Sequence, residues 1–242
     1  LDTYPGLFWC KSLRSVSLIP LVARLQIEFD GSDLHEGFLD KNYYGRDVFQ
    51  RLVLSSCGAD KQLLDGRFVA VLKRLREIGY LRKEDVQGRR LLQILVRDSG
   101  SYFPERRFRF LVDWDPNALA KLYVDEYGRY KIPLEIASGV STLQGFRLVF
   151  EAGLRCFPMG KGLNFLFQET GYMGYNYQTP FQMACTKHGR HEVLKEIENA
   201  LTDCYSHEAG DGVPFNTEEA LLLAASDAHL DGVYFILRRE PD

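Results

Sequence analysis

The stretch Thr179-Pro180-Phe181-Gln182-Met183-Ala184 has a counterpart at Ile132-Pro133-Leu134-Glu135-Ile136-Ala137, and the two prolines are 47 residues apart. Thr179 can cap the exposed N–H groups at a helix start, and proline suits the first helical position, where no N–H is needed. Phe181 and Ala184 fall on one helical face, and alanine is small enough for a second helix to approach closely. We therefore expect Ala137 and Ala184 to be buried where first and second helices meet.

Each stretch is followed by a second apolar helix, around residues 146–150 and 193–201. The repeated order of loop, short helix, tight turn and longer helix predicts consecutive antiparallel helix pairs in one stack over residues 132–201. The 47-residue step is longer than such a pair needs, and the extra residues lie between Cys156 and Gln178. We expect them to form a long loop that interrupts the stack.

A Gly-Arg step recurs upstream, at Gly45, Gly88 and Gly128, with spacings of 43 and 40 residues. After the first two glycines the chain reaches an apolar–apolar–Gln step, at residues 48–50 and 91–93, which predicts two further first helices. We expect each glycine to take a positive φ in the turn before its helix, where a Cβ is costly.

Helix ends are also marked in the sequence. Apolar residues from Phe68 to Ile78 occupy one helical face, and Gly79 follows as a helix-ending signal. We expect Gly153 to end its helix in the same way, residues 203–217 to form a loop, and residues 7–29 to hold one or two helices. Asp115-Pro116 is typical of a helix cap or a simple turn.

The two hexapeptides resemble the Thr-Pro-Leu-His-x-Ala signature of ankyrin repeats. Residues 146–184 also resemble a divergent ankyrin-like family that is expanded in some unicellular algae. The resemblance implies an all-α fold, an ankyrin-like helical repeat solenoid of stacked helix–turn–helix units with poorly formed hairpins. An irregular helical bundle would show similar periodicities, and the Gly-Arg register favours the array.

The same resemblance divides the chain into an N-terminal helical segment, 1–39, and an array of about five divergent units over 40–242. Their expected ranges are 40–80, 81–121, 122–170, 171–210 and 215–242. It implies a non-enzymatic module that binds other proteins as a scaffold.

Composition limits the partners. The chain has a net charge of −3 and a pI near 6.0, whereas nucleic-acid and anionic-membrane binders need a basic footprint. No apolar run is long enough for a membrane span. Five scattered cysteines fit reduced thiols. We expect a monomeric, intracellular protein, cytoplasmic or nuclear, without nucleic acid or membrane partners. Since the chain begins with Leu1, we expect its ends to be cut.

One cluster offers an alternative, a metal-binding regulatory domain. Soft ligands gather within 23 residues, namely Cys185, His188, His191, Cys204 and His207, and a zinc site needs four that converge tetrahedrally. Helix positions account for these residues without a metal, so we expect no metal and no cofactor.

Neither a Walker pattern nor a nucleophile elbow is present. We expect no catalytic residues; a third hypothesis is an enzyme with an unrecognised site.

Tyrosine and arginine are favoured binding anchors because they combine a large contact area with polar groups. Several stand just before expected first helices, where an ankyrin-like stack places its loop tips. These residues predict one partner-binding face, and the alternative is that some tyrosines pack between adjacent tips. The residues are Tyr43, Tyr44, Arg46, Arg89, Tyr127, Arg129, Tyr130, Tyr175 and Tyr177.

Overall fold

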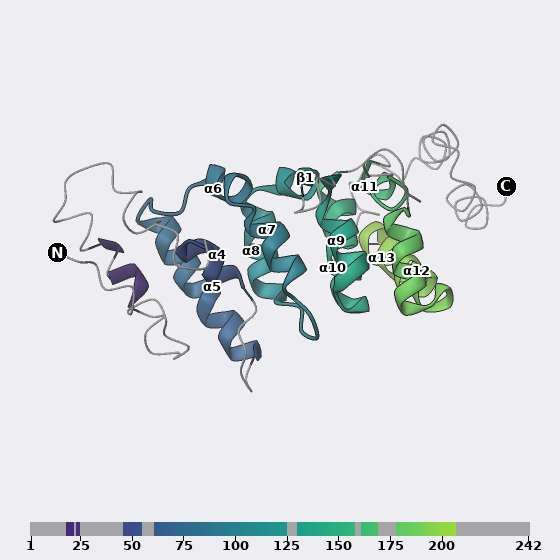
Figure 1. Cartoon of the computed structure of the whole chain (residues 1–242), viewed down its shortest axis with the longest axis horizontal. Coiled ribbons are helices and arrows are strands. Elements are labelled where there is room, and N and C mark those ends of the chain that lie inside the picture. The colour runs from purple at the N-terminus through teal and green to yellow at the C-terminus, as the bar shows by residue number, and fades with distance from the viewer. Residues whose placement is uncertain are drawn as a thin grey trace. The chain divides into compact units, whose positions relative to one another are not determined.

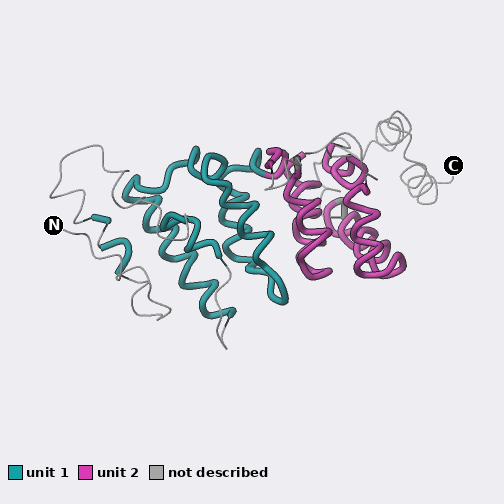
Figure 2. The backbone as a smooth tube through the Cα atoms, viewed as in Figure 1, with its two compact units in different colours: residues 1–118 teal, residues 119–242 magenta. Residues whose placement is uncertain are grey.

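A computed structural model of the chain describes residues 18–21, 23–24, 46–54, 61–124, 130–157, 161–168 and 178–206. These residues are mostly helical, and the strands among them are the two-residue β1 (Tyr123–Val124) and β2 (Tyr130–Lys131). The all-α fold class is therefore confirmed. The chain divides into two compact units, residues 1–118 and 119–242 (Figure 2).

Unit 1 contains two helix pairs, α4 with α5 and α7 with α8 (Figure 1). The first helices α4 and α7 contact each other, and so do the second helices α5 and α8. The short α6 contacts α7, and a 3₁₀ helix, η2, follows α8 in the chain. The bounds are α4 (Val48–Val53), α5 (Lys61–Glu77), α6 (Lys83–Gly88), α7 (Leu91–Arg97), α8 (Glu105–Trp114) and η2 (Pro116–Leu119).

The end of α5 confirms the expected role of Gly79, which has a φ of 75°. The N–H of Gly79 donates to the Arg76 carbonyl, and the N–H of Tyr80 donates to the Leu75 carbonyl. This pair of bonds satisfies carbonyls at the end of the helix, with the glycine in the left-handed region that other residues avoid. Tyr80 and Leu81 then turn inward and are buried.

The prediction that Gly88 takes a positive φ in the turn before a first helix is wrong. Gly88 is the last residue of α6, and the left-handed residue in this turn is Arg90, with a φ of 58°. The chain closes one short helix before it opens the next, so the reversal falls two residues later than the Gly-Arg register indicated. Gly45 and Gly128 lie outside the described residues.

Unit 2 repeats the arrangement of unit 1. Helices α9 and α10 form one pair and α12 and α13 another; α9 contacts α12, and α10 contacts α13 (Figure 1). The strands β1 and β2 pair antiparallel ahead of the first pair. The predicted helix pairs over 132–201 are present. The bounds are α9 (Pro133–Val140), α10 (Leu143–Cys156), α11 (Lys161–Asn164), α12 (Pro180–His188) and α13 (Arg190–Ser206).

The predicted start of α12 is confirmed in detail. Thr179 is the N-cap, and its hydroxyl accepts from the Gln182 N–H at 3.2 Å, while the Gln182 side chain accepts from the Thr179 N–H at 3.1 Å. Ala137 and Ala184 are fully buried, as expected. Local capping and a small residue at the helix junction thus define this pair.

Gly153 does not end its helix. α10 continues to Cys156, and Gly153 is buried within it. A Cβ on Gly162 of α11 would lie 2.5 Å from the Gly153 carbonyl oxygen, and one on Gly153 would lie 3.1 Å from Phe165. The two glycines therefore let α11 cross α10 at backbone contact.

Part of the expected long loop belongs to the core. After α11, Leu163 and Leu166 are buried, and the Phe181 N–H donates to the Leu166 carbonyl at 3.0 Å. This segment links α10 to the start of α12. Residues 158–160 and 169–177 lie outside the described residues.

The loop predicted at 203–217 is wrong for its first four residues, which belong to α13. The apolar face of α13 continues through Ala200 and Leu201, both buried, so the helix keeps its packing surface.

Of residues 7–29, those from 19 to 21 and 23 to 24 are helical. The expected last unit, 215–242, lies outside the described residues. None of the described helices combines the length and apolar character that crossing a bilayer requires.

Replacing Ala184 with Leu should destabilise the α12–α13 pair by about 1–3 kcal/mol, because the added carbons have no space at a fully buried site. Urea denaturation followed by circular dichroism would measure the change. Thr186→Leu on the exposed side of the same helix is the matched control and should shift stability by less than about 0.5 kcal/mol. Equal behaviour of the two variants would contradict the packing described for Ala184.

Candidate functional site: a basic groove between α5 and α8

The second helices of unit 1 are joined by a buried ion pair. Arg107 Nε donates to Asp65 Oδ1 at 2.7 Å, and the two side chains are 1% and 2% exposed. The N–H groups of Arg106 and Arg107 donate to the same carboxylate at 2.9 and 3.3 Å. Because α8 begins after Pro104 without a side-chain cap of its own, Asp65 of α5 serves as its cap.

The same arginine reaches α4. Arg107 Nη1 donates to the carbonyl oxygens of Leu52 and Leu54 at 3.1 and 2.7 Å, and its guanidinium lies 5.0 Å from the Phe68 ring centroid. Burial lowers the pKa of Arg107, and the hydrogen bond with Asp65 opposes that shift. One side chain thus satisfies the end of α4 and the start of α8.

These contacts make α5 and α8 run in the same direction. Asp65 meets Arg107 near the start of both helices, and Arg76 lies over the Trp114 ring, 4.5 Å from its centroid, near their ends. An open groove of about 590 Å³ follows the seam between them. It extends from Gly66 at one end to Arg76 and Asp113 at the other.

Four basic side chains line the groove, two from each helix. Lys73 and Arg76 are three residues apart on α5, and Arg106 and Arg109 are three residues apart on α8, so each pair projects from one helical face. Val69, Ala70 and Phe110 supply apolar surface between them. Asp113 is the acidic residue of the lining.

The four cations differ in their contacts. Arg76 covers the rings of Trp114 and Phe110, at 4.5 and 5.4 Å, and Arg109 pairs with Glu105 at 2.8 Å. Within the described ranges, no carboxylate forms an ion pair with the side chain of Lys73 or Arg106. These two charges face solvent and are available to an anionic ligand.

Gly66 makes room for one of them. A Cβ at this position would lie 2.9 Å from Nη1 of Arg106. Glycine inside a helix costs about 0.5–1 kcal/mol relative to alanine, and here it lets a guanidinium rest against the backbone of α5. The groove is therefore built into the packing of the two helices.

The structure describes three of the nine predicted partner-binding residues. Arg46 lies 3.8 Å from Asp98, and Tyr130 belongs to β2, where its backbone alone is described. Arg89 is the third. The other six lie outside the described residues: Tyr43, Tyr44, Tyr127, Arg129, Tyr175 and Tyr177.

Arg89 has a structural role in unit 1. Its Nη1 pairs with Asp47, the N-cap of α4, and its Nε pairs with Asp85 of α6, each at 2.8 Å. Burial opposes the charge, but the hydrogen bonds with Asp85 and Asp47 outweigh it and raise the pKa of Arg89. Gln50 Nε2 also donates to the Arg89 carbonyl at 3.1 Å. Arg89 thus joins α4 to the α6–α7 turn, and its role as a partner anchor stays a prediction.

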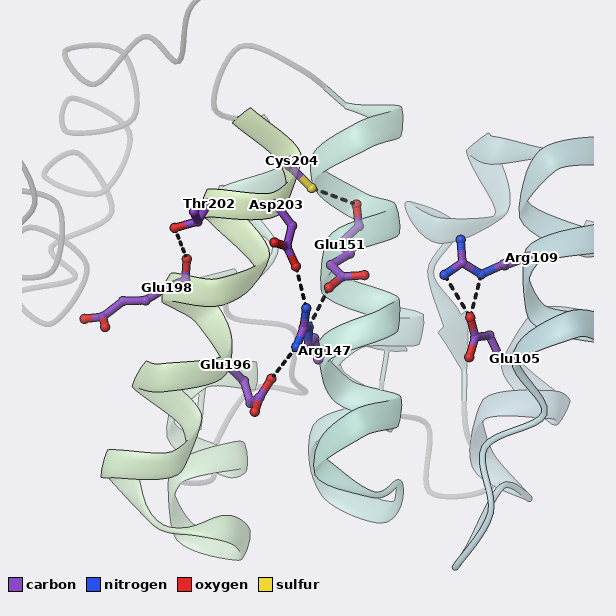
Figure 3. Close-up of polar contacts among 9 residues, drawn as sticks. All are labelled: Glu105, Arg109, Arg147, Glu151, Glu196, Glu198, Thr202, Asp203 and Cys204. Carbon is purple, nitrogen blue, oxygen red and sulfur yellow. Dashed lines mark hydrogen bonds and ion pairs between the residues drawn. The ribbon is translucent and has the colours of Figure 1, made fainter. Parts of the chain in front are cut away.

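Unit 2 carries an acidic network between its second helices. Arg147 of α10 pairs with Glu151 at 2.6 Å, and with Glu196 and Asp203 of α13 at 3.0 and 2.6 Å (Figure 3). The hydrogen bond with Glu151 is the main reason that the pKa of Arg147 is raised. Three carboxylates around one arginine hold α10 against α13 and leave excess negative charge there.

The alternative metal cluster is not assembled in the described part of the chain. No group of three or more His, Cys, Asp or Glu side chains is placed there to hold a metal ion. His188 ends α12, and His191 is exposed on α13. Cys204 Sγ is 3.9 Å from the Glu151 carbonyl oxygen, and His207 lies outside the described residues. The metal-binding alternative therefore has no described ligand set.

Sequence reasoning missed the groove. Its signal was present as two basic i, i+3 pairs, at 73 and 76 and at 106 and 109. The whole-chain charge of −3 concealed it, because residues 61–118 alone contain thirteen basic and eight acidic residues.

Comparison with known proteins identifies no relative: no family model matches the chain, and no curated protein or solved structure matches it.

Replacing Asp65 with Ala should destabilise unit 1 by about 3–5 kcal/mol, since it leaves the Arg107 guanidinium buried without its carboxylate. Two N–H groups at the start of α8 also lose their acceptor. Chemical denaturation would measure the loss. Asp113→Ala removes an exposed carboxylate from α8 and should change stability by less than about 0.5 kcal/mol; comparable losses in both variants would contradict the capping role of Asp65.

Stability should also depend on His188 in mildly acidic solution. Burial lowers the pKa of His188 below its ordinary value of 6.5, and the nearby Lys187 adds to the shift. A base with a lowered pKa stabilises the fold above the pKa of the unfolded chain, and this contribution is lost as the pH falls through the lower folded pKa. The free energy of unfolding should therefore decrease as the pH falls below about 6.5.

A His188→Gln variant should show a smaller decrease over the same pH range, because glutamine has no proton to take up. His191→Gln is the matched control from the exposed start of α13. Denaturation midpoints at a series of pH values would measure the effect. An unchanged acid dependence in the His188 variant would contradict this assignment.

Proposed function

We propose that the chain is a non-enzymatic protein-interaction module, an ankyrin-like solenoid whose helix pairs present a surface to other proteins. The observation that supports this is the repeated packing within each unit. First helices contact first helices, and second helices contact second helices, in α4–α5 with α7–α8 and in α9–α10 with α12–α13. Units that contact mainly their neighbours are typical of repeat proteins that bind partners.

The hairpin of β1 and β2 adds to this support. The paired residues Tyr123 with Lys131 and Val124 with Tyr130 bring the chain back on itself just before α9. Ankyrin-like repeats carry such hairpin tips ahead of their first helices. Tyr127 and Arg129 lie between the two strands in the sequence, so we expect this tip to contribute to a partner-binding face.

We further expect the module to act as a monomer inside the cell. The five cysteines are scattered along the sequence, at residues 10, 57, 156, 185 and 204. Scattered reduced cysteines are typical of intracellular proteins. A protein-binding function also accounts for the basic side chains that the α5–α8 groove exposes.

The proposal is tested by affinity capture with the full chain, followed by binary binding measurements with each purified partner. The double variant Tyr127→Ala/Arg129→Ala should weaken partner binding by about 1 kcal/mol or more, as expected of anchor residues. Its stability should change by less than about 1 kcal/mol, as expected of exposed positions.

Lys195→Ala is the control, since Lys195 is exposed on α13 away from the hairpin in sequence. It should leave both affinity and stability unchanged. The proposed function would be contradicted if the chain captured no protein that an unrelated bait protein does not also capture. Equal affinity of the wild type and the double variant would contradict the hairpin tip as an anchor.

A further inference from the structure

We propose that the α5–α8 groove binds a short acidic segment of a partner protein, with carboxylates on the basic side chains and an apolar side chain between them. This inference rests on the proposed function and names the chemistry of one partner. It concerns the seam between the second helices of unit 1, whose residues differ from those predicted at the hairpin tips.

Charge is the first argument. Lys73, Arg76, Arg106 and Arg109 line the groove against the single carboxylate of Asp113. The lining therefore has a net positive charge, and Lys73 and Arg106 lack an ion pair within the described residues. Carboxylates placed beside each of these two would gain charge-assisted hydrogen bonds, one from each helix.

The fixed geometry of the arginines is the second argument. The Arg106 guanidinium rests against α5 at Gly66, and Arg76 is held over Trp114 and Phe110. Side chains that are already positioned lose less conformational entropy when a ligand binds. Their planar donors match a carboxylate in two-point contacts.

The apolar floor is the third argument, and it favours a peptide over a bare polyanion. Ala70 is exposed in the groove lining, and Val69 and Phe110, which are 9% and 7% exposed, border it. A nucleic-acid backbone would bring phosphates near Asp113 and leave this floor uncovered. An acidic peptide with Leu or Phe between its carboxylates would cover the floor and could avoid Asp113.

The dimensions fit a short segment. From Gly66 to Arg76, α5 rises about 15 Å at 1.5 Å per residue. An extended peptide covers that length with about five residues. The volume of about 590 Å³ lies within the usual range of ligand clefts, about 300–1,000 Å³.

The test is fluorescence anisotropy with the full chain and a labelled peptide whose central five residues alternate Asp or Glu with Leu. A second peptide replaces each acid by its amide, Asn or Gln, and keeps the apolar residues. We expect the acidic peptide to bind at least about ten-fold more tightly than the amide peptide, because the carboxylate charge supplies the attraction. Affinity should fall as salt is added.

The variant Lys73→Glu/Arg106→Glu should weaken binding of the acidic peptide by at least about ten-fold. The matched control is Lys83→Glu/Arg97→Glu, which reverses two exposed charges in the same unit, outside the groove lining. It changes the net charge by the same amount and should alter affinity by less than about two-fold. Circular dichroism melting of both variants would establish that they fold as the wild type does.

A smaller change can replace charge reversal if that variant does not fold. Gly66→Ala would displace the Arg106 guanidinium from α5 while raising helix propensity. We expect it to fold and to weaken the binding of the acidic peptide measurably. Gly88→Ala, at the end of α6 and outside the groove lining, where a Cβ would meet nothing within 4 Å, should change affinity less.

Four results would overturn the proposal: no binding of the acidic peptide at millimolar concentration, equal affinity for the amide peptide, equal losses in both double variants, or tighter groove-dependent binding of a single-stranded DNA oligonucleotide. Partner capture by the chain separates this inference from the proposed function. A partner that binds the Lys73→Glu/Arg106→Glu variant as well as the wild type would leave the interaction function standing and place its contact outside the groove.

Discussion

The buried pair of Asp65 and Arg107 is the contact on which the arrangement of unit 1 depends. The carboxylate caps α8 from a neighbouring helix, and the guanidinium satisfies the carbonyls that end α4. Burying two charges costs free energy even when they are paired, and apolar replacements can be as stable. The pair therefore contributes mainly specificity: it sets which helices meet, in which direction, and in which register.

A basic side chain at a neighbouring helix end recurs in unit 2. Lys187 of α12 donates to the carbonyl of Ser141, the C-cap of α9, at 2.7 Å. Cations at helix C-termini satisfy free carbonyls and interact favourably with the helix dipole. Burial lowers the pKa of Lys187. In both units, the free carbonyl groups at the end of a short first helix accept hydrogen bonds from a basic side chain of the next helix pair.

Charge is distributed unevenly over the second helices. In unit 1 the α5–α8 seam is basic and open, and its arginines lie beside the exposed Ala70 and the largely buried Phe110. In unit 2 the seam of α10 and α13 is closed by Arg147 and its three carboxylates (Figure 3). Similarly packed helix pairs therefore differ in the charges they expose: the seam of α10 and α13 uses its charges internally, and the groove between α5 and α8 presents them to solvent. This difference is why a basic groove can exist on a chain whose net charge is −3.

Local rules account for the elements that could be predicted. Thr179 and Pro180 act through neighbours in the same helix, and Gly79 ends α5 through bonds to residues three to five positions earlier, so adjacent sequence carried the information. The roles of Gly153, Arg89 and Asp65 depend on residues brought close by folding. Gly153 allows α11 to cross α10, Arg89 pairs with a carboxylate 42 positions earlier, and Asp65 caps a helix that starts 40 positions later.

The groove also depends on residues that are brought close together by folding. Each basic i, i+3 pair could be read from the chain, but nothing local indicates that α5 and α8 lie side by side. The two helices are joined by a buried ion pair whose partners are 42 residues apart. The periodicity of apolar residues along one helix does not indicate which other helix packs against it. The sequence carries the helices, their caps and their apolar faces, because these depend on contacts within one turn. The opposition of the two basic rows arises with tertiary packing, because a seam exists only where two helices have met.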